Sequence, residues 1–171
     1  MKDNNSTQDI EQQLKRLENN LYALNKAYQR LQKAIDLNHE QEIYTAIGET
    51  LLWTMTTNEW HQSHNPQYKR RRNKDENGQL LFGLLHAYNS MKHNMEFITI
   101  HTNEGGVQFP ISFPLEIPPI SVHWMPAGEI LDGGGYKQKE NYKRYIEGKD
   151  VLDSFKLAMD FLQSEYNNIC K

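Results

Sequence analysis

The sequence has a single cysteine, Cys170, among its 171 residues. One thiol cannot form an internal disulfide, and it excludes a metal site built from several cysteines. The sequence also lacks any apolar run approaching the ~20 residues that a helix needs to cross a bilayer. Its mean hydropathy is low, at −0.82. These absences predict a protein without a membrane partner.

A strong charge of one sign is absent as well. The 19 Lys and Arg residues nearly balance the 22 Asp and Glu residues, giving a net charge of −3. The whole molecule therefore has no positive field that recruits nucleic acid or anionic membrane, and any such contact must be local. Residues 1–13 contain no apolar signal core, so we expect no export. A cytoplasmic protein with a single domain over residues 1–171 is the simplest interpretation.

Apolar periodicity predicts two long helices in the first part of the chain. Residues 1–6 are polar and are predicted to form a disordered tail. Apolar residues then recur at intervals of four and three, the heptad pattern of a packed helix. This seam either faces the rest of a bundle or also pairs with a second chain. Asn38, with Gln41 three residues later, is predicted to cap a second helix that extends to about Trp60. The seam consists of Ile10, Leu14, Leu17, Leu21, Leu24, Tyr28, Leu31 and Ile35.

Residues 61–78 lack an apolar period and contain Pro66 and Gly78, so they are predicted to form an exposed loop. A basic cluster within this stretch is a candidate phosphate contact, with a solvated loop as the alternative. His61 and His64 suggest a metal site, but no third ligand follows in register, and we predict neither a metal nor another cofactor. The basic cluster consists of Lys69, Arg70, Arg71 and Arg72.

The period changes from helical to alternating after residue 95. Residues 95–130 contain short β-branched and aromatic runs, separated by a turn signal at 103–106 and by prolines. They predict a small antiparallel hairpin or three-stranded sheet, with one strand over 107–113. A short helix follows over 138–147, closed by Gly148, and Asp150 is predicted to cap a last long helix. The fold class is therefore mainly α, a four-long-helix bundle with a small antiparallel β insertion between the third and last long helices.

The third long helix, which includes residues 80–93, carries two stripes. One is apolar and forms the expected core face. The second consists of Phe82, His86, Asn89 and His93, which recur at helical spacing. Asn89 and His93 are one turn apart, so they can hold one phosphate, one hydroxyl or a partner chain. The alternative is a polar stripe that faces water or closes a contact between helices.

The stretch Tyr88-Asn89-Ser90-Met91-Lys92-His93 on this helix resembles the RNxxxH motif of the HEPN superfamily, the higher eukaryote and prokaryote nucleotide-binding domains. The order of the following elements is also similar to that of small bacterial HEPN-like proteins, over roughly residues 10–165. The resemblance implies a dimer whose two motifs face each other across RNA, cleaved without metal. It makes His93 and Asn89 the candidate catalytic residues.

This sequence departs from the motif at one position, because Tyr88 stands where the family has arginine. A phenol is neutral and donates one hydrogen bond, whereas guanidinium is a cationic fork. We therefore expect a HEPN-like binding or regulatory module, a homodimer with RNA as a possible partner, that does not cleave. The alternatives are a metal-independent ribonuclease and a protein-interaction module built on the heptad seam. The candidate binding residues are Tyr88, Lys92, His86, Lys69, Arg70, Arg71 and Arg72.

Overall fold

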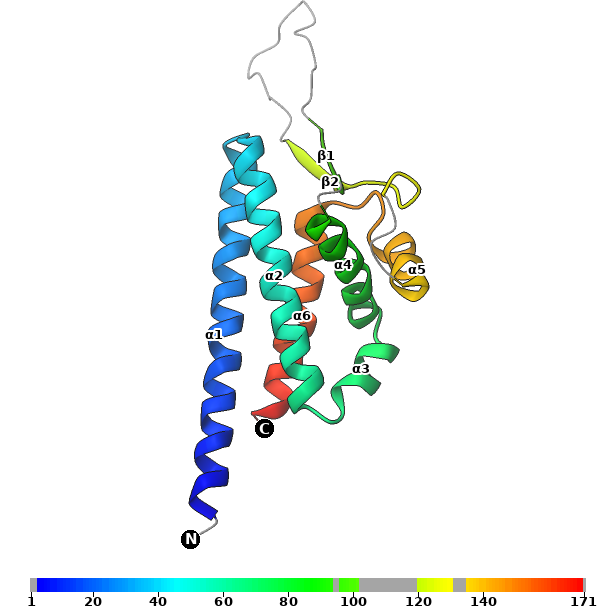
Figure 1. The fold of residues 1–171 in the computed structure, drawn as a ribbon. Coiled ribbons are helices and arrows are strands. Elements are labelled where there is room, and N and C mark those ends of the chain that lie inside the picture. The colour runs from blue at the N-terminus through cyan, green and yellow to red at the C-terminus, as the bar shows by residue number, and fades with distance from the viewer. Residues whose placement is uncertain (1–2, 94–95, 102–119, 131–134, 171) are drawn as a thin grey trace, which may run out of the picture.

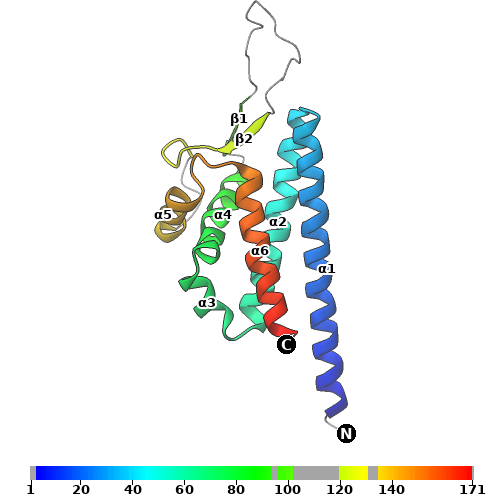
Figure 2. The ribbon, with the colours of Figure 1, turned by 180° about the vertical axis from the view of Figure 1, so that it is seen from behind.

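The structure, a computed structural model, describes residues 3–93, 96–101, 120–130 and 135–170. Within them the chain forms six helices and a two-stranded antiparallel sheet, which confirms the predicted mainly helical fold with a small sheet. In chain order the elements are α1 (Asp3–Asp36), α2 (Glu40–His64), α3 (Tyr68–Lys74), α4 (Glu76–Lys92), β1 (Ile98–His101), β2 (Ser121–Trp124), α5 (Tyr136–Tyr145) and α6 (Val151–Ile169). Figures 1 and 2 show α1 at one side of the molecule and the short helices α3 and α5 at the other.

The heptad seam of α1 is buried mainly within the chain, against α2 and α6. Leu17 and Leu31 are fully buried, whereas Ile10 is 57% exposed. The predicted tail is wrong over residues 3–6, because α1 already begins at Asp3; residues 1–2 lie outside the described part. The first turns of α1 extend past the end of the other helices (Figure 1).

The turn between α1 and α2 is displaced by one residue from the prediction. Asn38 does not cap α2; it has φ of 49°, a left-handed conformation that asparagine tolerates better than most residues. His39 takes the N-cap position instead, and its side chain accepts a hydrogen bond from the N–H of Glu42. The reversal of the chain therefore uses Asn38 for its shape and His39 for the cap.

The exposed loop predicted over residues 61–78 is wrong. Helix α2 continues to His64, α3 begins at Tyr68, and α4 begins at Glu76 with Asp75 as its N-cap. Apolar periodicity fails here because the side chains that face inward are mostly polar. The buried residues of this range include His61, Asn65, Tyr68 and Arg72, and those of the α2 turns just before it include Thr54, Thr57 and Asn58.

The buried threonines of α2 are satisfied within their own helix. The hydroxyl of Thr54 donates to the carbonyl of Thr50, and that of Thr57 donates to the carbonyl of Trp53, both at 2.7 Å. A helix can therefore bury these hydroxyls without leaving a donor unpaired. This is why α2 runs on beyond a threonine-rich stretch that has low intrinsic helix propensity.

Two hydrogen-bonded groups hold α3 against its neighbours. Asn58 Oδ1 accepts from the Tyr68 hydroxyl at 2.7 Å and from Arg72 Nη1 at 3.1 Å. Glu165 of α6 accepts from Arg71 Nε at 2.7 Å and, more weakly, from Asn65 Nδ2 at 3.3 Å. The ends of α2 and α6 are thus joined through α3 by polar contacts.

The sheet is small and its two edges differ. Strand β1 pairs with β2 in the register Ile98↔Trp124, and the far edge of β2 is bonded to the chain before α6. There Trp124 accepts from the N–H of Gly148 at 2.9 Å and donates to the carbonyl of Lys149 at 3.1 Å. Gly148 has φ of 70°, as expected for a residue that closes a helix. The predicted turn at 103–106 and strand over 107–113 lie outside the described residues.

Helices α5 and α6 complete the core. Gly83 of α4 lies beside α5, where a Cβ would come within 3.1 Å of Tyr142 Cα, so only glycine allows this close approach. Asp150 caps α6 as predicted, because its Oδ1 accepts from the N–H of Leu152 at 2.8 Å. Among the described residues, no helix combines the length and the apolar character that crossing a membrane requires.

Candidate nucleic-acid interface

The predicted Asn89–His93 pair lies at the end of α4, and His93 is outside the helix proper. The last helical residue is Lys92, and His93 is the C-cap, whose N–H donates to the carbonyls of Asn89 at 3.2 Å and Ser90 at 3.1 Å. The His93 side chain is exposed. A helix C-terminus carries a negative partial charge, which favours cations and disfavours phosphate. The position of His93 therefore suits a peripheral hydrogen bond to a ligand better than stabilisation of a phosphate transition state.

The stripe that precedes His93 is a contact between helices rather than an open site. His86 is buried, with its ring centroid 5.2 Å from that of Tyr142 on α5. Asn89 is half-buried, and its Nδ2 donates to Gln138 Oε1 of α5 at 3.2 Å. The prediction of His86 as a binding residue is therefore wrong, because α5 covers it. The sequence could not show this, since nothing in α4 indicates which helix packs on it.

Tyr88 and Lys92 contact each other at the same helix end. The Lys92 Nζ lies 4.6 Å from the centroid of the Tyr88 ring, a cation–π arrangement. Tyr88 is half-buried and Lys92 is exposed. Lys92 thus supplies a positive charge near Asn89, but on a flexible stem and without the planar fork of a guanidinium.

The basic cluster at residues 69–72 is divided by its environment. Lys69 and Arg70 are exposed on α3, so they remain candidate phosphate contacts. Arg71 is held by Glu165, whose hydrogen bonds raise the pKa of the guanidinium. Arg72 is buried, its guanidinium carbon lies 4.2 Å from the Phe82 ring centroid, and burial lowers its pKa. The binding role predicted for Arg72 is therefore wrong, because its side chain is buried. The role predicted for Arg71 stays a prediction, since its side chain is 34% exposed while it pairs with Glu165.

The cations of α5, the helix that packs on α4, were not among the binding residues predicted from the sequence. This helix carries four Lys or Arg residues and one acidic residue, Glu140. Lys137 Nζ lies 4.9 Å from the centroid of Phe82, on whose ring Arg72 of α3 also packs. Cations from both short helices therefore meet at one aromatic ring of α4. The available signal was the density of Lys and Arg over residues 137–144.

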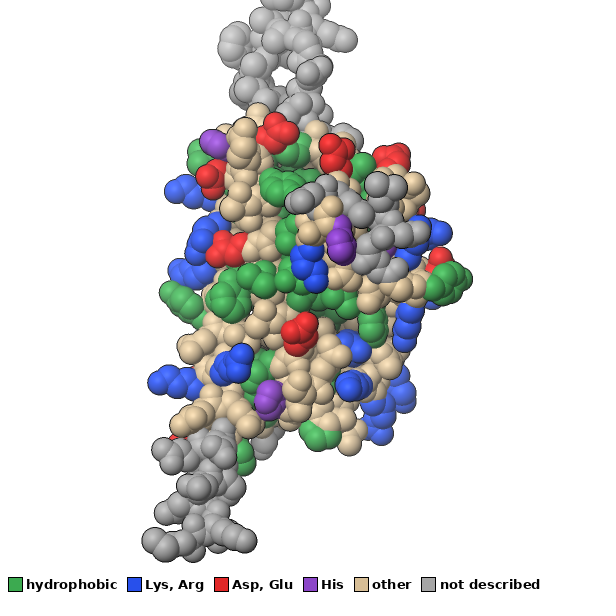
Figure 3. Space-filling view, in the orientation of Figure 1, with side chains coloured by type: hydrophobic (Ala, Val, Ile, Leu, Met, Phe, Trp, Pro, Cys, Tyr) green, Lys and Arg blue, Asp and Glu red, His purple; other side chains and the backbone are tan. Residues whose placement is uncertain are grey.

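The exposed cations of α3 and α5 form what we term the basic face. Figure 3 shows Lys and Arg side chains along the margin of the molecule where α3 and α5 lie in Figure 1. Tyr136, at the start of α5, is 82% exposed beside these charges. The Asn89–Gln138 hydrogen bond connects the first turn of α5 to the end of α4. The basic face consists of Lys69, Arg70, Lys74, Lys137, Lys143 and Arg144.

Over the described part of the chain, no three His, Cys, Asp or Glu side chains form a group that could hold a metal ion. His61 is buried with its ring stacked on Tyr68, and His64 stacks on Trp60. Comparison of the chain with models of protein families, with curated proteins and with solved structures finds no match.

Proposed function

We propose that this protein is a HEPN-like helical-bundle module that binds single-stranded RNA on its basic face without cleaving it. The observation that carries the proposal is the concentration of positive charge on two short helices. Helix α3 has five cations and no acidic residue, and α5 has four. Together they hold nine of the 19 Lys and Arg residues in a chain whose net charge is −3.

A local cluster of positive charge is sufficient for binding nucleic acid, because contacts with the phosphate backbone supply most of the affinity. Each cation that neutralises a phosphate releases condensed counterions, so affinity depends steeply on salt. The six cations of the basic face are exposed. Arg71 and Arg72 are not counted in this RNA-binding charge, because Arg71 is paired with Glu165 and Arg72 is buried.

An exposed aromatic ring beside these cations favours a single strand over a duplex. Tyr136 is 82% exposed and is followed at once by Lys137. Unpaired bases stack on aromatic side chains while nearby cations follow the backbone, and a duplex offers no such free base face. Asn89 and His93, near the same end of α5, add hydrogen-bonding groups at the margin of this surface.

The end of α4 supports the proposed absence of cleavage. An Asn–His pair can orient a hydroxyl or move a proton, but the developing charge on phosphate needs a fixed cation. Tyr88 provides a phenol where the motif has a guanidinium, and Lys92 packs on its ring. Loss of such electrostatic stabilisation typically costs about 10² to 10³ in rate. Binding is thus the function that this site supports.

Fluorescence anisotropy with a labelled, unstructured RNA oligonucleotide tests the proposal. The variant Lys69→Gln/Arg70→Gln/Lys143→Gln removes three exposed charges from α3 and α5. For single strands each lost phosphate contact lowers the slope of log affinity against log salt by about 0.7, so the slope should fall by about 2. At low salt the affinity should drop about 10- to 100-fold.

A matched variant on α1 separates the basic face from a general charge effect. Lys15→Gln/Arg16→Gln/Lys33→Gln removes the same charges from exposed positions of a helix at the other side of the molecule. Its RNA affinity should stay within about twofold of the unmodified protein, since screened distant charges act weakly. Equal losses in the two variants, or no binding by the unmodified protein at low salt, would contradict the proposed function.

A further inference from the structure

Among the residues that the structure describes, nothing bonds to the backbone groups on the outer edge of β1. In an antiparallel pair, alternate residues exchange hydrogen bonds, and the residues between them direct their N–H and C=O groups outward. Met125 donates to the carbonyl of Phe97 at 3.0 Å, which identifies Phe97 and Thr99 as the residues that bond toward β2. Ile98 and Ile100 therefore direct their backbone groups to the other side. Within the described residues, no hydrogen-bond partner meets these groups.

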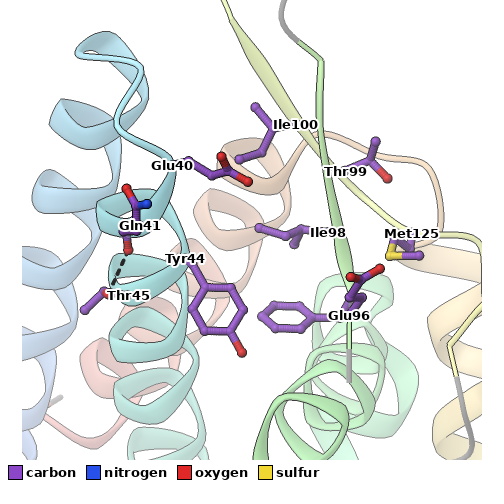
Figure 4. A pocket seen from close by; sticks show the side chains of 10 residues that line it. Glu40, Gln41, Tyr44, Thr45, Glu96, Ile98, Thr99, Ile100 and Met125 are labelled. Carbon is purple, nitrogen blue, oxygen red and sulfur yellow. Dashed lines mark hydrogen bonds between the residues drawn. The ribbon is translucent and has the colours of Figure 1, made fainter. Parts of the chain in front are cut away.

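A groove lies between this edge and the first turns of α2. It has a volume of about 890 Å³, and Ile98 and Ile100 point across it toward α2 (Figure 4). Tyr44 of α2 is 43% exposed in the facing wall, and its ring centroid is 5.6 Å from that of Phe97. Both Ile98 and Ile100 are only half-buried. The groove thus presents an open strand edge together with apolar side chains.

The charge of the groove has one sign. Glu40 and Glu96 line it, and no Lys or Arg stands among the other described residues that line it. In Figure 4 the two carboxylates lie on opposite walls, Glu40 on α2 and Glu96 just before β1. Both residues are exposed. Carboxylates in such positions attract cationic side chains, and they disfavour a ligand that carries negative charge.

We propose that this groove binds an extended segment of a partner protein that carries Lys or Arg, as an additional strand on β1. Backbone groups of the segment would bond to the N–H and C=O groups of Ile98 and Ile100. Every second side chain would enter the apolar space beside Tyr44, because alternate residues of a strand face the same side. Flanking cations would pair with Glu40 and Glu96. This surface is separate from the basic face.

The charge of the groove distinguishes this occupant from two others. A second copy pairing antiparallel through the Ile98 and Ile100 edge of its own β1 would place its Glu96 at the Ile100 end of the first copy, the end where Glu40 lies (Figure 4), a juxtaposition of like charges. Residues 102–119 of the same chain contain Glu104 and Glu116 and no Lys or Arg. Neither occupant complements the two carboxylates, whereas a basic segment does.

A labelled, acetylated peptide of alternating arginine and valine tests the proposal by anisotropy and by amide hydrogen exchange measured with NMR. The peptide should bind, and the amides of Ile98 and Ile100 should become protected from exchange. A peptide with glutamate in place of arginine should not bind. A peptide methylated on alternate backbone nitrogens should lose binding, because it cannot donate to the strand edge.

The variant Glu40→Gln/Glu96→Gln should weaken binding by about 2- to 5-fold for each carboxylate, the usual range for exposed charge pairs. The matched variant Glu11→Gln/Glu129→Gln removes two exposed carboxylates that do not line the groove, and it should leave the affinity unchanged. Absence of binding, or equal binding of the acidic peptide, would overturn the proposal. Strong protection of the Ile98 and Ile100 amides in the free protein would also overturn it. Light scattering would then show whether a second copy or the chain itself covers the edge.

Discussion

The ion pair between Arg71 and Glu165 offers a test of how the polar contacts around α3 stabilise the fold, because its partners differ in exposure. The Glu165 side chain is 4% exposed and that of Arg71 is 34% exposed. When a partner is removed, the group left behind either reaches water or remains buried without compensation. We therefore expect the free energy of unfolding to fall more when Arg71 is replaced than when Glu165 is replaced.

The magnitudes follow from burial and from the remaining hydrogen bonds. Breaking a buried pair by removing one member costs about 3–5 kcal/mol. Arg71→Ala should lie near the lower end, about 3 kcal/mol, because Asn65 still donates to the carboxylate. Glu165→Gln should cost only about 1–2 kcal/mol, since glutamine keeps one acceptor and the half-exposed guanidinium can turn to water.

Urea denaturation followed by circular dichroism measures these differences, with Arg30→Ala as the matched control. Arg30 pairs with Glu49 at 2.8 Å, but its side chain is 65% exposed, so its loss should cost at most about 1 kcal/mol. The double variant Arg71→Ala/Glu165→Gln should be more stable than Arg71→Ala alone, because the uncompensated carboxylate is gone. If Arg71→Ala is no more harmful than Arg30→Ala, or the double variant is the least stable, the reasoning is refuted.

Four further outcomes are expected. Burial lowers the pKa of His61 to about 4, so between that pKa and about 6.5 the unfolded state binds more protons and stability falls as the pH drops. The free energy of unfolding, measured by urea denaturation, should fall by about 3 kcal/mol between pH 7 and pH 4, and this fall should be absent in His61→Gln. Gly83→Ala should lower the free energy of unfolding by about 1–2 kcal/mol in the same assay, although alanine has a higher helix propensity than glycine. The reason is that the new Cβ would lie 2.5 Å from Ile146 Cγ1. On gels, labelled RNA should stay intact with or without chelator, and Tyr88→Arg should create weak cleavage that His93→Ala removes; strong cleavage by the unmodified protein contradicts this. Light scattering at micromolar concentration should give a mass twice that of the chain, as expected for the predicted homodimer, and a single species of 20.1 kDa would contradict it.

The elements that were predictable from sequence are those with an apolar period or a clear cap. The heptad seam of α1, the Asp150 cap of α6 and the strand character at Ile98 each rest on local signals that the fold keeps. Helix α3 was not predictable by the same rule. Its two buried residues are Tyr68 and Arg72, and the second becomes a core residue only because Asn58 and two aromatic rings surround it.

The candidate site was predictable only in part, because tertiary contacts decide which polar residues stay available. Spacing placed His86 and Asn89 on one stripe, but it could not show that α5 covers the first and bonds to the second. Lys69 and Arg71 are neighbours in the same cluster, yet Arg71 faces a glutamate 94 residues later in the chain. No local pattern distinguishes the two.

The sequence separation of that contact also has a consequence for folding. Helices α1 and α2 are joined by a short turn and pack on each other, so they can associate early in folding. Arg71 and Asn65 can form their contacts only after α6, about a hundred residues further along the chain, has folded. During this interval the far end of α2 is open. This end presents Asn58, His61 and Thr57 rather than aliphatic side chains. The paired helices α1 and α2 therefore expose less apolar surface before α6 is added than an ordinary core helix would. We expect the polar character of this end to reduce aggregation while the chain is being synthesised.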